Sequence, residues 1–281
     1  MNIPVVAIVG RPNVGKSALF NRMIGHHEAI VSEEAGTTRD RHFALAEWQG
    51  RKFWLVDTGG LTEDSQLPMD IEIRKQVAQA IEEADLLLFV LDAKVGLHPS
   101  DARIAELLRQ AGKPWVVVAN KVDDPRETDY YEFYRLGAGD PQPVSATNGK
   151  NSGDLLDVIV QRIPEFTDDE DSSFLRVAVI GRPNVGKSSF VNRLLGEERL
   201  VVSEVAGTTR DAIDSPFTYH GRDLFFVDTA GLRRQSKVED GVEFYSSLRS
   251  RRAIDRADIC LLLIDAVEGL HNQDLKIANL A

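Results

Sequence analysis

The chain has 281 residues, 43% of them hydrophobic, and a formal net charge of −11. The hydrophobic content is enough for packed cores, while the acidic balance argues against a bulk electrostatic grip on nucleic acid. A single cysteine, Cys260, allows neither a disulfide framework nor a cysteine zinc site, so we expect no disulfide partner. No apolar run approaches the ~20 residues of a membrane span, and we expect a soluble, cytoplasmic protein with no membrane role.

The sequence GRPNVGKS occurs twice, at residues 10–17 and 181–188, with an offset of 171 positions. Each copy follows a short apolar run, residues 4–9 or 175–180, that predicts a buried strand. Each also fits the pattern of a phosphate-binding loop, or P-loop. Glycines let such a loop wrap closely around a polyphosphate, whose charge faces successive N–H groups and the start of a helix. The repeat therefore predicts two phosphate sites.

Every residue of the two loops is a candidate nucleotide contact. We expect Lys16 and Lys187 to reach the β and γ phosphates, and Ser17 and Ser188 to place a hydroxyl on Mg²⁺. The other loop residues are Gly10, Arg11, Pro12, Asn13, Val14 and Gly15 in the first copy and Gly181, Arg182, Pro183, Asn184, Val185 and Gly186 in the second.

Strands and helices alternate along the first half of the chain. The elements predicted after the strand at 4–9 are, in order, a helix at 16–24, a polar loop at 32–41, hairpin strands at 42–48 and 52–56, a helix at 69–83, a strand at 86–91, a helix at 100–110, strands at 115–119 and 143–144, and a helix at 153–162. This alternation predicts an α/β fold with a mostly parallel sheet, helices on both faces and one antiparallel hairpin. Ligands of such sheets bind at the carboxyl ends of the strands, where the polar motifs fall.

Two motifs of the first half suit the handling of a γ phosphate. The sequence DTGG at 57–60 ends a predicted strand, so we expect Asp57 to hold Mg²⁺ through water and the Gly60 N–H to sense the γ phosphate. The sequence AGTTRD at 35–40 lies in the polar loop, where we expect Thr38 to bind Mg²⁺ and to close over the nucleotide. The catalytic groups we assign here are Lys16, Thr38 and Gly60.

A third group of motifs favours guanine as the base. The sequence NKVD at 120–123 follows a predicted strand, and Asp123 can accept hydrogen bonds from the N1–H and the 2-amino group of guanine. Adenine offers neither donor and would leave this charge unpaired, which disfavours an ATP-using protein. We expect the backbone at Ser145 and Ala146 to donate to guanine O6. The base-binding residues are therefore Asn120, Lys121, Asp123, Ser145 and Ala146.

The second half repeats the phosphate-handling motifs. AGTTRD returns at 206–211 and DTAG occupies 228–231, both at the offset of 171. Their expected roles are Mg²⁺ binding by Ser188, Thr209 and Asp228, and catalysis by Lys187, Thr209 and Gly231. Further along, GLH at 269–271 matches GLH at 96–98 with an offset of 173. On this plan Ala281 matches Leu108, so the counterparts of the base-binding residues would come after Ala281.

The repeat predicts two tandem P-loop NTPase domains of the Ras-like G type. We place the first domain at 1–164, an acidic linker at 165–174 and the second domain at 175–281, incomplete because it stops before its own base-binding motifs. The predicted strand at 259–264 would then form a bare apolar edge of its sheet. We therefore expect the chain to be a fragment of a longer protein.

The catalytic arrangement departs from the Ras-like one at a single position. The glutamine that orients the attacking water in that class follows DxxG, whereas this chain has Leu61 and Leu232 there. Hydrolysis would depend on positioning and electrostatics, with a second cation beside the phosphates as one source of charge. The alternative is a nucleotide-dependent binding module in which one domain hydrolyses GTP very slowly.

With both motif sets in view, the whole chain resembles the EngA or Der family, the bacterial double-Era-like tandem GTPases. GRPNVGKS, TTRD and DTGGL or DTAGL carry the resemblance. It implies GTP binding and hydrolysis with Mg²⁺, and a role in assembly of the large ribosomal subunit. It also implies a C-terminal KH-like domain absent from this chain, contacts to rRNA and ribosomal proteins through that domain and the second switch region, and K⁺ beside the P-loop asparagines, Asn13 and Asn184.

Basic residues follow the second DxxG: Arg233, Arg234, Lys237, Arg249, Arg251 and Arg252. Two interpretations stay open for them. They form either a solvated helix face or a switch surface that meets RNA or the missing domain when the nucleotide changes. His98 and His271, which recur at the start of a predicted helix, favour a polar helix-start role over catalysis.

Overall fold

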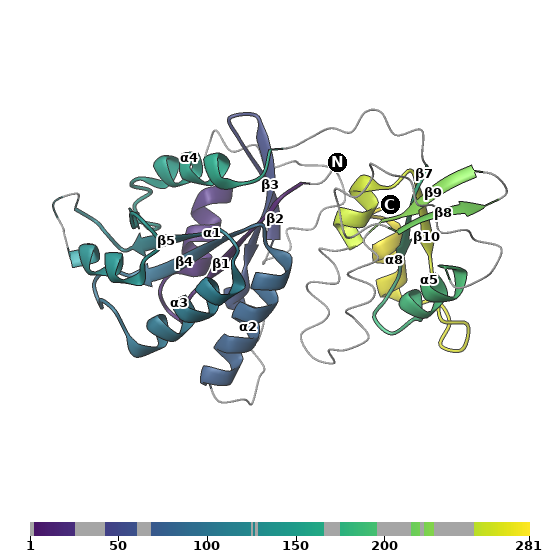
Figure 1. Cartoon of the computed structure of the whole chain (residues 1–281), viewed down its shortest axis with the longest axis horizontal. Helices are drawn as coiled ribbons and strands as arrows, with labels where there is room; N and C mark the ends of the chain where they lie inside the picture. Colours follow the sequence, from purple (N-terminus) through teal and green to yellow (C-terminus); the bar gives the residue numbers. More distant parts are fainter. Residues whose placement is uncertain are drawn as a thin grey trace. The chain divides into compact units, whose positions relative to one another are not determined.

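The computed structural model describes residues 3–25, 43–60, 69–124, 126, 129–165, 175–195, 215–219, 222–227 and 250–281. The chain divides into two compact units, Ile3–Phe166 and Thr167–Ala281. Each unit contains its own sheet and its own copy of the P-loop, as Figure 1 shows. None of the described helices is long and apolar enough to cross a membrane.

The first unit is built on a six-stranded sheet with the strand order β2-β3-β1-β4-β5-β6. The strands are β1 (Val5–Val9), β2 (Phe43–Trp48), β3 (Arg51–Asp57), β4 (Leu86–Asp92), β5 (Trp115–Asn120) and β6 (Gln142–Pro143). All neighbours pair in parallel except β2 and β3, which form the predicted antiparallel hairpin. The predicted α/β fold with a mostly parallel sheet is therefore confirmed.

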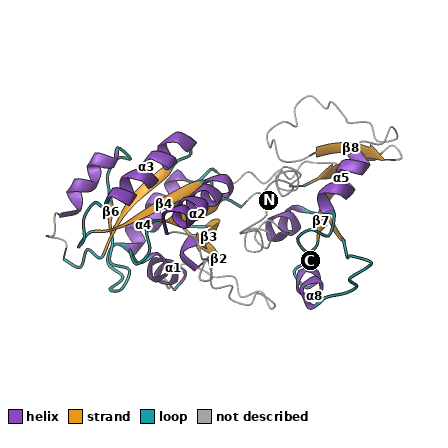
Figure 2. Ribbon diagram, turned by 90° about the horizontal axis from the view of Figure 1, so that it is seen from below, coloured by secondary structure: helices purple, strands orange, loops and turns teal. Residues whose placement is uncertain are grey.

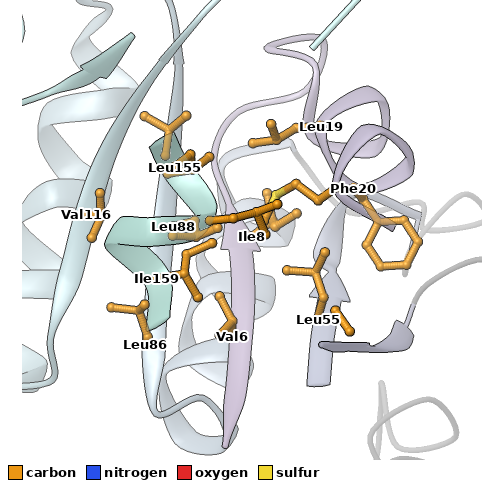
Figure 3. Close-up of a cluster of buried hydrophobic side chains, with 14 of the residues drawn as sticks. Val6, Ile8, Leu19, Phe20, Leu55, Leu86, Leu88, Val116, Leu155 and Ile159 are labelled. Atoms are coloured by element: carbon orange, nitrogen blue, oxygen red, sulfur yellow. The ribbon is translucent and has the colours of Figure 1, made fainter. Parts of the chain in front are cut away.

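Helices cover both faces of this sheet (Figure 2). They are α1 (Lys16–Ile24), α2 (Met69–Glu83), α3 (Pro99–Ala111) and α4 (Ser152–Arg162), with short 3₁₀ helices η1 (Thr58–Gly60) and η2 (Asp129–Leu136). Successive side chains of a strand point to opposite faces. Val6 and Ile8 of β1 pack with Leu19 of α1 and Ile159 of α4 (Figure 3). The opposite face belongs to α2 and α3, which contact each other.

Two details of the first unit differ from the sequence prediction. The hairpin turn has two residues rather than three, because Arg51 already pairs with Trp48. Gln49 and Gly50 both have positive φ, 50° and 76°, as a two-residue turn that matches the strand twist requires. The second difference is η2, which the sequence analysis does not predict and which buries Phe133 in the core.

The second unit repeats the centre of this plan with a four-stranded sheet of order β10-β7-β9-β8. Its elements are β7 (Leu175–Ile180), α5 (Lys187–Leu195), β8 (Ser215–Tyr219), β9 (Arg222–Phe226), a helical stretch at 250–256, β10 (Ile259–Leu262) and α8 (Asn272–Ala278). The order matches β4-β1-β3-β2 of the first unit. β10 ends two residues before the predicted strand does and lies at the edge of the sheet, where Ile259 and Leu261 are 43% and 37% exposed. The predicted apolar edge is confirmed.

Candidate functional site

The first P-loop joins β1 to α1 in a conformation that needs glycine at two positions. Gly10 and Gly15 have φ values of 150° and 95°. A Cβ on Gly10 would lie 2.5 Å from the carbonyl oxygen of Val90, and one on Gly15 would lie 2.3 Å from Nδ2 of Asn120. The loop therefore lies directly against the carboxyl ends of β4 and β5, which is where parallel sheets bind ligands.

Lys16 is held inside this loop. Its side chain is buried, and Nζ donates hydrogen bonds to the carbonyl oxygens of Gly10 and Arg11 at 2.9 and 2.8 Å. Burial lowers the pKa of Lys16, while the nearby Asp57 carboxylate opposes the shift. A buried ammonium is costly without compensating charge, so an anion in the loop would relieve this cost.

The DxxG motif packs against the same lysine. Asp57 is buried at the end of β3 and accepts a hydrogen bond from the Gly59 N–H at 2.9 Å. A Cβ on Gly59 would lie 2.9 Å from Cε of Lys16, so the first glycine of the pair allows the close approach. Gly60 ends η1. The structure thus brings Lys16, Asp57 and Gly59 together.

These residues fit a magnesium ion only in part. The described residues contain no cluster of three or more His, Cys, Asp or Glu side chains that could hold a metal. Asp57 supplies one carboxylate, and Ser17 is exposed in the first turn of α1. Mg²⁺ usually takes one or two protein oxygens and completes its shell with water and phosphate oxygens. This donor set therefore suits Mg²⁺ that arrives with a nucleotide.

Asn120 connects the P-loop to the segment predicted to bind the base. Its Nδ2 donates to the Val14 carbonyl at 2.9 Å, and its Oδ1 accepts from the Ala146 N–H at 3.1 Å. The side chain is buried, with 2% exposure. Both ends of this amide are thus occupied within the protein, which makes Asn120 a brace that sets the distance between the phosphate and base regions.

Asp123 is partly exposed beside this brace, and the protein keeps it ionised. Oδ1 accepts from the Ser145 hydroxyl at 2.7 Å and from Nδ2 of Asn148 at 2.9 Å, and Oδ2 pairs with Lys94 Nζ at 2.5 Å. The hydrogen bonds from Lys94 and then Ser145 lower the pKa of Asp123. Lys94 and Asn148 belong to none of the sequence motifs that predict this site.

Lys121 also braces the site from within. Its backbone has a positive φ of 69°, and its Nζ donates to the Asn13 carbonyl at 3.0 Å and pairs with Asp92 at 2.5 Å. Asp92 ends β4 and also accepts a hydrogen bond from the Lys94 N–H at 3.0 Å. Lys121 therefore connects β4, β5 and the P-loop.

The second P-loop has nearly the same geometry. Gly181 has a φ of 148°, and a Cβ there would lie 2.5 Å from the Leu263 carbonyl oxygen. Lys187 Nζ donates to the carbonyls of Gly181 and Arg182 at 2.8 and 2.6 Å. Burial lowers the pKa of Lys187 to about 8. At Gly186 the two loops differ, because a Cβ there would meet no atom within 4 Å among the described residues.

Part of the predicted site lies outside the described residues. These positions are Thr38, Leu61, Thr209, Asp228, Gly231, Leu232 and the basic residues Arg233, Arg234, Lys237 and Arg249. Arg251 is described, and its Nε lies 3.5 Å from Asp255 one helical turn later.

A protein-family model described as 50S ribosome-binding GTPase matches residues 5–121 and again residues 176–281. The chain belongs to this family. The two matched segments contain the two P-loops, so the repeat seen in the sequence and in the sheets is a repeat of one family domain.

Curated relatives are similar over the whole chain. A protein named GTPase Der from Gemmatimonas aurantiaca is 72% identical over 281 residues, which are 100% of this chain and 64% of the relative. A GTPase Der from Caldanaerobacter subterraneus is 53% identical over 283 residues, again with 64% of the relative covered. The resemblance to the EngA or Der family is therefore confirmed, and the chain spans about two thirds of the length of these relatives.

Solved structures of Era proteins are also similar. One is an Era variant from Aquifex aeolicus bound to GDP and AlF₄⁻, with a TM-score of 0.46, 25% identity and 93% of each chain covered. Another is Era in complex with MgGDPNP and part of 16S ribosomal RNA, with a TM-score of 0.45, 23% identity, and 100% of this chain and 99% of that one covered.

Proposed function

We propose that this chain binds guanine nucleotides and hydrolyses GTP to GDP and phosphate. The observation that carries the proposal is the convergence of Asn120, Asp123 and the Ala146 N–H beside a P-loop whose buried lysine donates to backbone carbonyls of the loop. The ionised Asp123 can accept from the N1–H and 2-amino group of guanine, and adenine has neither donor. Two domains, 1–164 and 175–281, joined by the linker at 165–174, would each hold one phosphate loop.

The residues of the first site would have two roles, phosphate binding and Mg²⁺ binding. Lys16 and the P-loop N–H groups would bind the β and γ phosphates, and the Gly60 N–H would face the γ phosphate. Ser17 and Asp57, with Thr38, would hold Mg²⁺, which neutralises charge that develops on the phosphate oxygens. Ser188, Thr209 and Asp228 would do the same beside Lys187 and Gly231 in the second domain.

We expect a monovalent cation to stabilise the negative charge that develops on the phosphate oxygens. In Ras-like proteins a glutamine and an arginine finger contribute to this step. Asn13 and Asn184 support this expectation, because both are exposed in their P-loops and share a left-handed backbone with φ of 66° and 61°. We expect K⁺ to bind beside these asparagines and the phosphates. GTPase rates in matched K⁺ and Na⁺ buffers check this, and equal rates would contradict it.

We further propose that the nucleotide state controls association with the large ribosomal subunit or its precursor, in the cytoplasm. Support comes from the description of the matching family as 50S ribosome-binding. With a net charge of −11, this chain would need local basic contacts to rRNA and ribosomal proteins. The basic residues after the second DxxG are one candidate, and the third of the relatives' length beyond this chain is the other.

A nucleotide competition assay tests the base specificity directly. In the chain with Lys187→Ala, which silences the second site, bound fluorescent GDP should be displaced by GTP at concentrations at least about a hundredfold lower than those needed for ATP, because adenine offers the Asp123 carboxylate no hydrogen-bond donor. The variant with both Lys16→Ala and Lys187→Ala provides the blank. Equal displacement by ATP and GTP would contradict the proposal.

A further inference from the structure

Both P-loops are attached through their arginine to a helix that follows a neighbouring parallel strand, α3 after β4 in the first unit and α8 after β10 in the second. Nε of Arg11 donates to Oδ1 of Asp101 at 2.6 Å, where Asp101 lies in the first turn of α3. Nε of Arg182 lies 3.0 and 3.1 Å from the two oxygens of Asp274, in the first turn of α8. Both aspartates have 0% exposure. The arginine side chains therefore face the protein interior.

Each aspartate has a second partner that fixes its helix. Oδ2 of Asp101 accepts from the His98 N–H at 2.9 Å, and Oδ2 of Asp274 accepts from the His271 N–H at 2.9 Å. These are capping boxes, in which the residue at the third helical position binds the N-cap backbone. One carboxylate thus caps the helix and anchors the loop.

The arginine backbone holds the P-loop lysine at the same time. The carbonyl oxygen of Arg11 accepts from Lys16 Nζ at 2.8 Å, and that of Arg182 accepts from Lys187 Nζ at 2.6 Å. A continuous chain of contacts therefore runs from the lysine through the arginine and the aspartate to the N-terminus of the helix. It is present in both units.

The spacing of the repeat strengthens this observation. Arginine and aspartate are 90 residues apart in the first unit and 92 apart in the second. The pair is thus formed in both units although the register between them shifts by two residues. In both, Nη2 of the arginine is buried and has no hydrogen-bond partner among the residues that the structure describes. An unpaired buried donor is costly, and the pairing through Nε offsets that cost in both units, with a further ion pair from Arg182 Nη1 to Glu268 at 3.0 Å in the second.

We infer that Arg11–Asp101 and Arg182–Asp274 are positioning pairs that keep Lys16 and Lys187 in place for the phosphates. The inference rests on the proposed function and names a further part of the same site. The arginine must hold its backbone still when the lysine amine shifts from the P-loop carbonyls toward a phosphate. A side chain anchored to a buried, helix-bound carboxylate provides that resistance, so α3 and α8 become part of the phosphate site.

The first loop allows the cleanest test, because Asp123 lets base and phosphate contributions be measured separately. In the 281-residue chain with Lys187→Ala, the substitution Asp101→Asn should weaken GDP binding by on the order of tenfold. An amide has only one acceptor oxygen, so its NH₂ group must face either the Arg11 Nε–H or the His98 N–H. The measurement is titration with fluorescent GDP and with IDP, which lacks the 2-amino group.

A positioning role predicts a specific pattern. The ratio of GDP to IDP affinity should stay at the parent value, because the base contacts are untouched. Arg11→Lys, which keeps a charge for Asp101, should retain most of the GDP affinity that Arg11→Met loses. Asp154→Asn removes an exposed first-turn acid from α4 and should leave GDP binding unchanged.

Two results would overturn the inference. One is parental GDP affinity in Asp101→Asn. The other is joint loss of GDP affinity, of the GDP-to-IDP ratio and of thermal stability, which would mean a general structural defect. Absence of GDP binding by the parent chain would instead overturn the proposed function, and the inference with it.

Discussion

At the scale of single residues, the surroundings of Asp123, Lys16 and Lys187 determine how readily each side chain is ionised. Asp123 retains its negative charge because Lys94 and Ser145 bind the ionised form, whereas Lys16 and Lys187 lose basicity because burial penalises theirs. The base region therefore offers a strong acceptor, and the phosphate regions offer ammonium groups that an anion would stabilise. These opposite electrostatic settings lead to two predictions.

The first concerns the identity of the base. Asp123→Asn should lower GTP affinity by at least about a hundredfold and raise the affinity for xanthosine triphosphate. The asparagine carbonyl can accept from the N1–H, and its amide can donate to the 2-oxo group of xanthine but not to a 2-amino group. Competition against fluorescent GDP and its xanthosine analogue measures both changes.

Asp124→Asn is the matched control for this substitution. Asp124 is adjacent in sequence, and its carboxylate pairs with Arg126 at 2.9 Å. Its loss should change neither affinity. An Asp123→Asn variant that still prefers GTP over the xanthosine nucleotide would show that this carboxylate does not bind the base.

The second prediction is a pH effect on nucleotide-free protein. The pKa of Lys187 is about 8 in the folded chain and near 10.5 when unfolded. Between these values the unfolded chain binds more protons, so the contribution of Lys187 to the free energy of unfolding should rise with pH from about 8 upward. Below pH 8 its burial should be destabilising.

Urea unfolding of the second unit at pH 7.5 and 9.5 measures this effect. Lys187→Met removes the titrating group and serves as the comparison. The parent chain should gain more stability than Lys187→Met over this range. An equal gain in both proteins would contradict the assignment of the pH effect to Lys187.

At the scale of elements, the loops fit the strands around them through glycines. Gly15→Ala should abolish nucleotide binding at the first site, because the new Cβ would lie 2.3 Å from Asn120 Nδ2 and φ is 95°. The new Cβ of Gly50→Ala would lie within 4 Å of no atom of the described residues, at a φ of 76°. This substitution should cost about 1–2 kcal/mol of stability from backbone strain alone and leave binding intact.

Fluorescent GDP titration and thermal unfolding of the two alanine variants measure these effects. The titration is run with the second site silenced by Lys187→Ala. Near-parental binding by Gly15→Ala would show that the approach of Asn120 to the loop is not needed for the nucleotide.

Most of the strands and helices could be predicted from the sequence. Apolar runs gave the parallel strands, and helical periodicity gave the helices, in several cases to within a residue. η2 could not be predicted, because its eight residues are mostly polar or aromatic and its two buried side chains, Phe133 and Leu136, are too few for a clear period.

The site residues show the same limit. Motifs identify Lys16, Asp57, Asn120 and Asp123, because their chemistry requires fixed residue types at fixed spacings. Lys94, Asn148 and Asp101 reach the site through contacts between segments 25 to 90 residues apart. A single sequence contains no signal for such pairings, and the recurrence of GLH at 96–98 and 269–271 predicted only a polar helix start.

At the scale of the whole molecule, one chain contains two copies of a family domain, each with its own sheet and its own P-loop. The second sheet exposes apolar side chains on β10, whereas its counterpart β4 is buried throughout. The two copies therefore differ in their surroundings although their phosphate loops are nearly the same. Both copies have a leucine, Leu61 or Leu232, at the position of the Ras-like glutamine, so the turnover of each copy is measured separately.

GTP turnover by the parent chain, by Lys16→Ala, by Lys187→Ala and by the double variant tests the central claim most directly. Release of phosphate should require Mg²⁺ and should fall in each single variant to the rate of the remaining site. The double variant should show no turnover above buffer, and in Lys187→Ala, where only the first site remains, ATP should not replace GTP. Turnover that survives in the double variant, or binding of GTP without release of phosphate by the parent chain, would contradict the account of this chain as a GTP-hydrolysing protein.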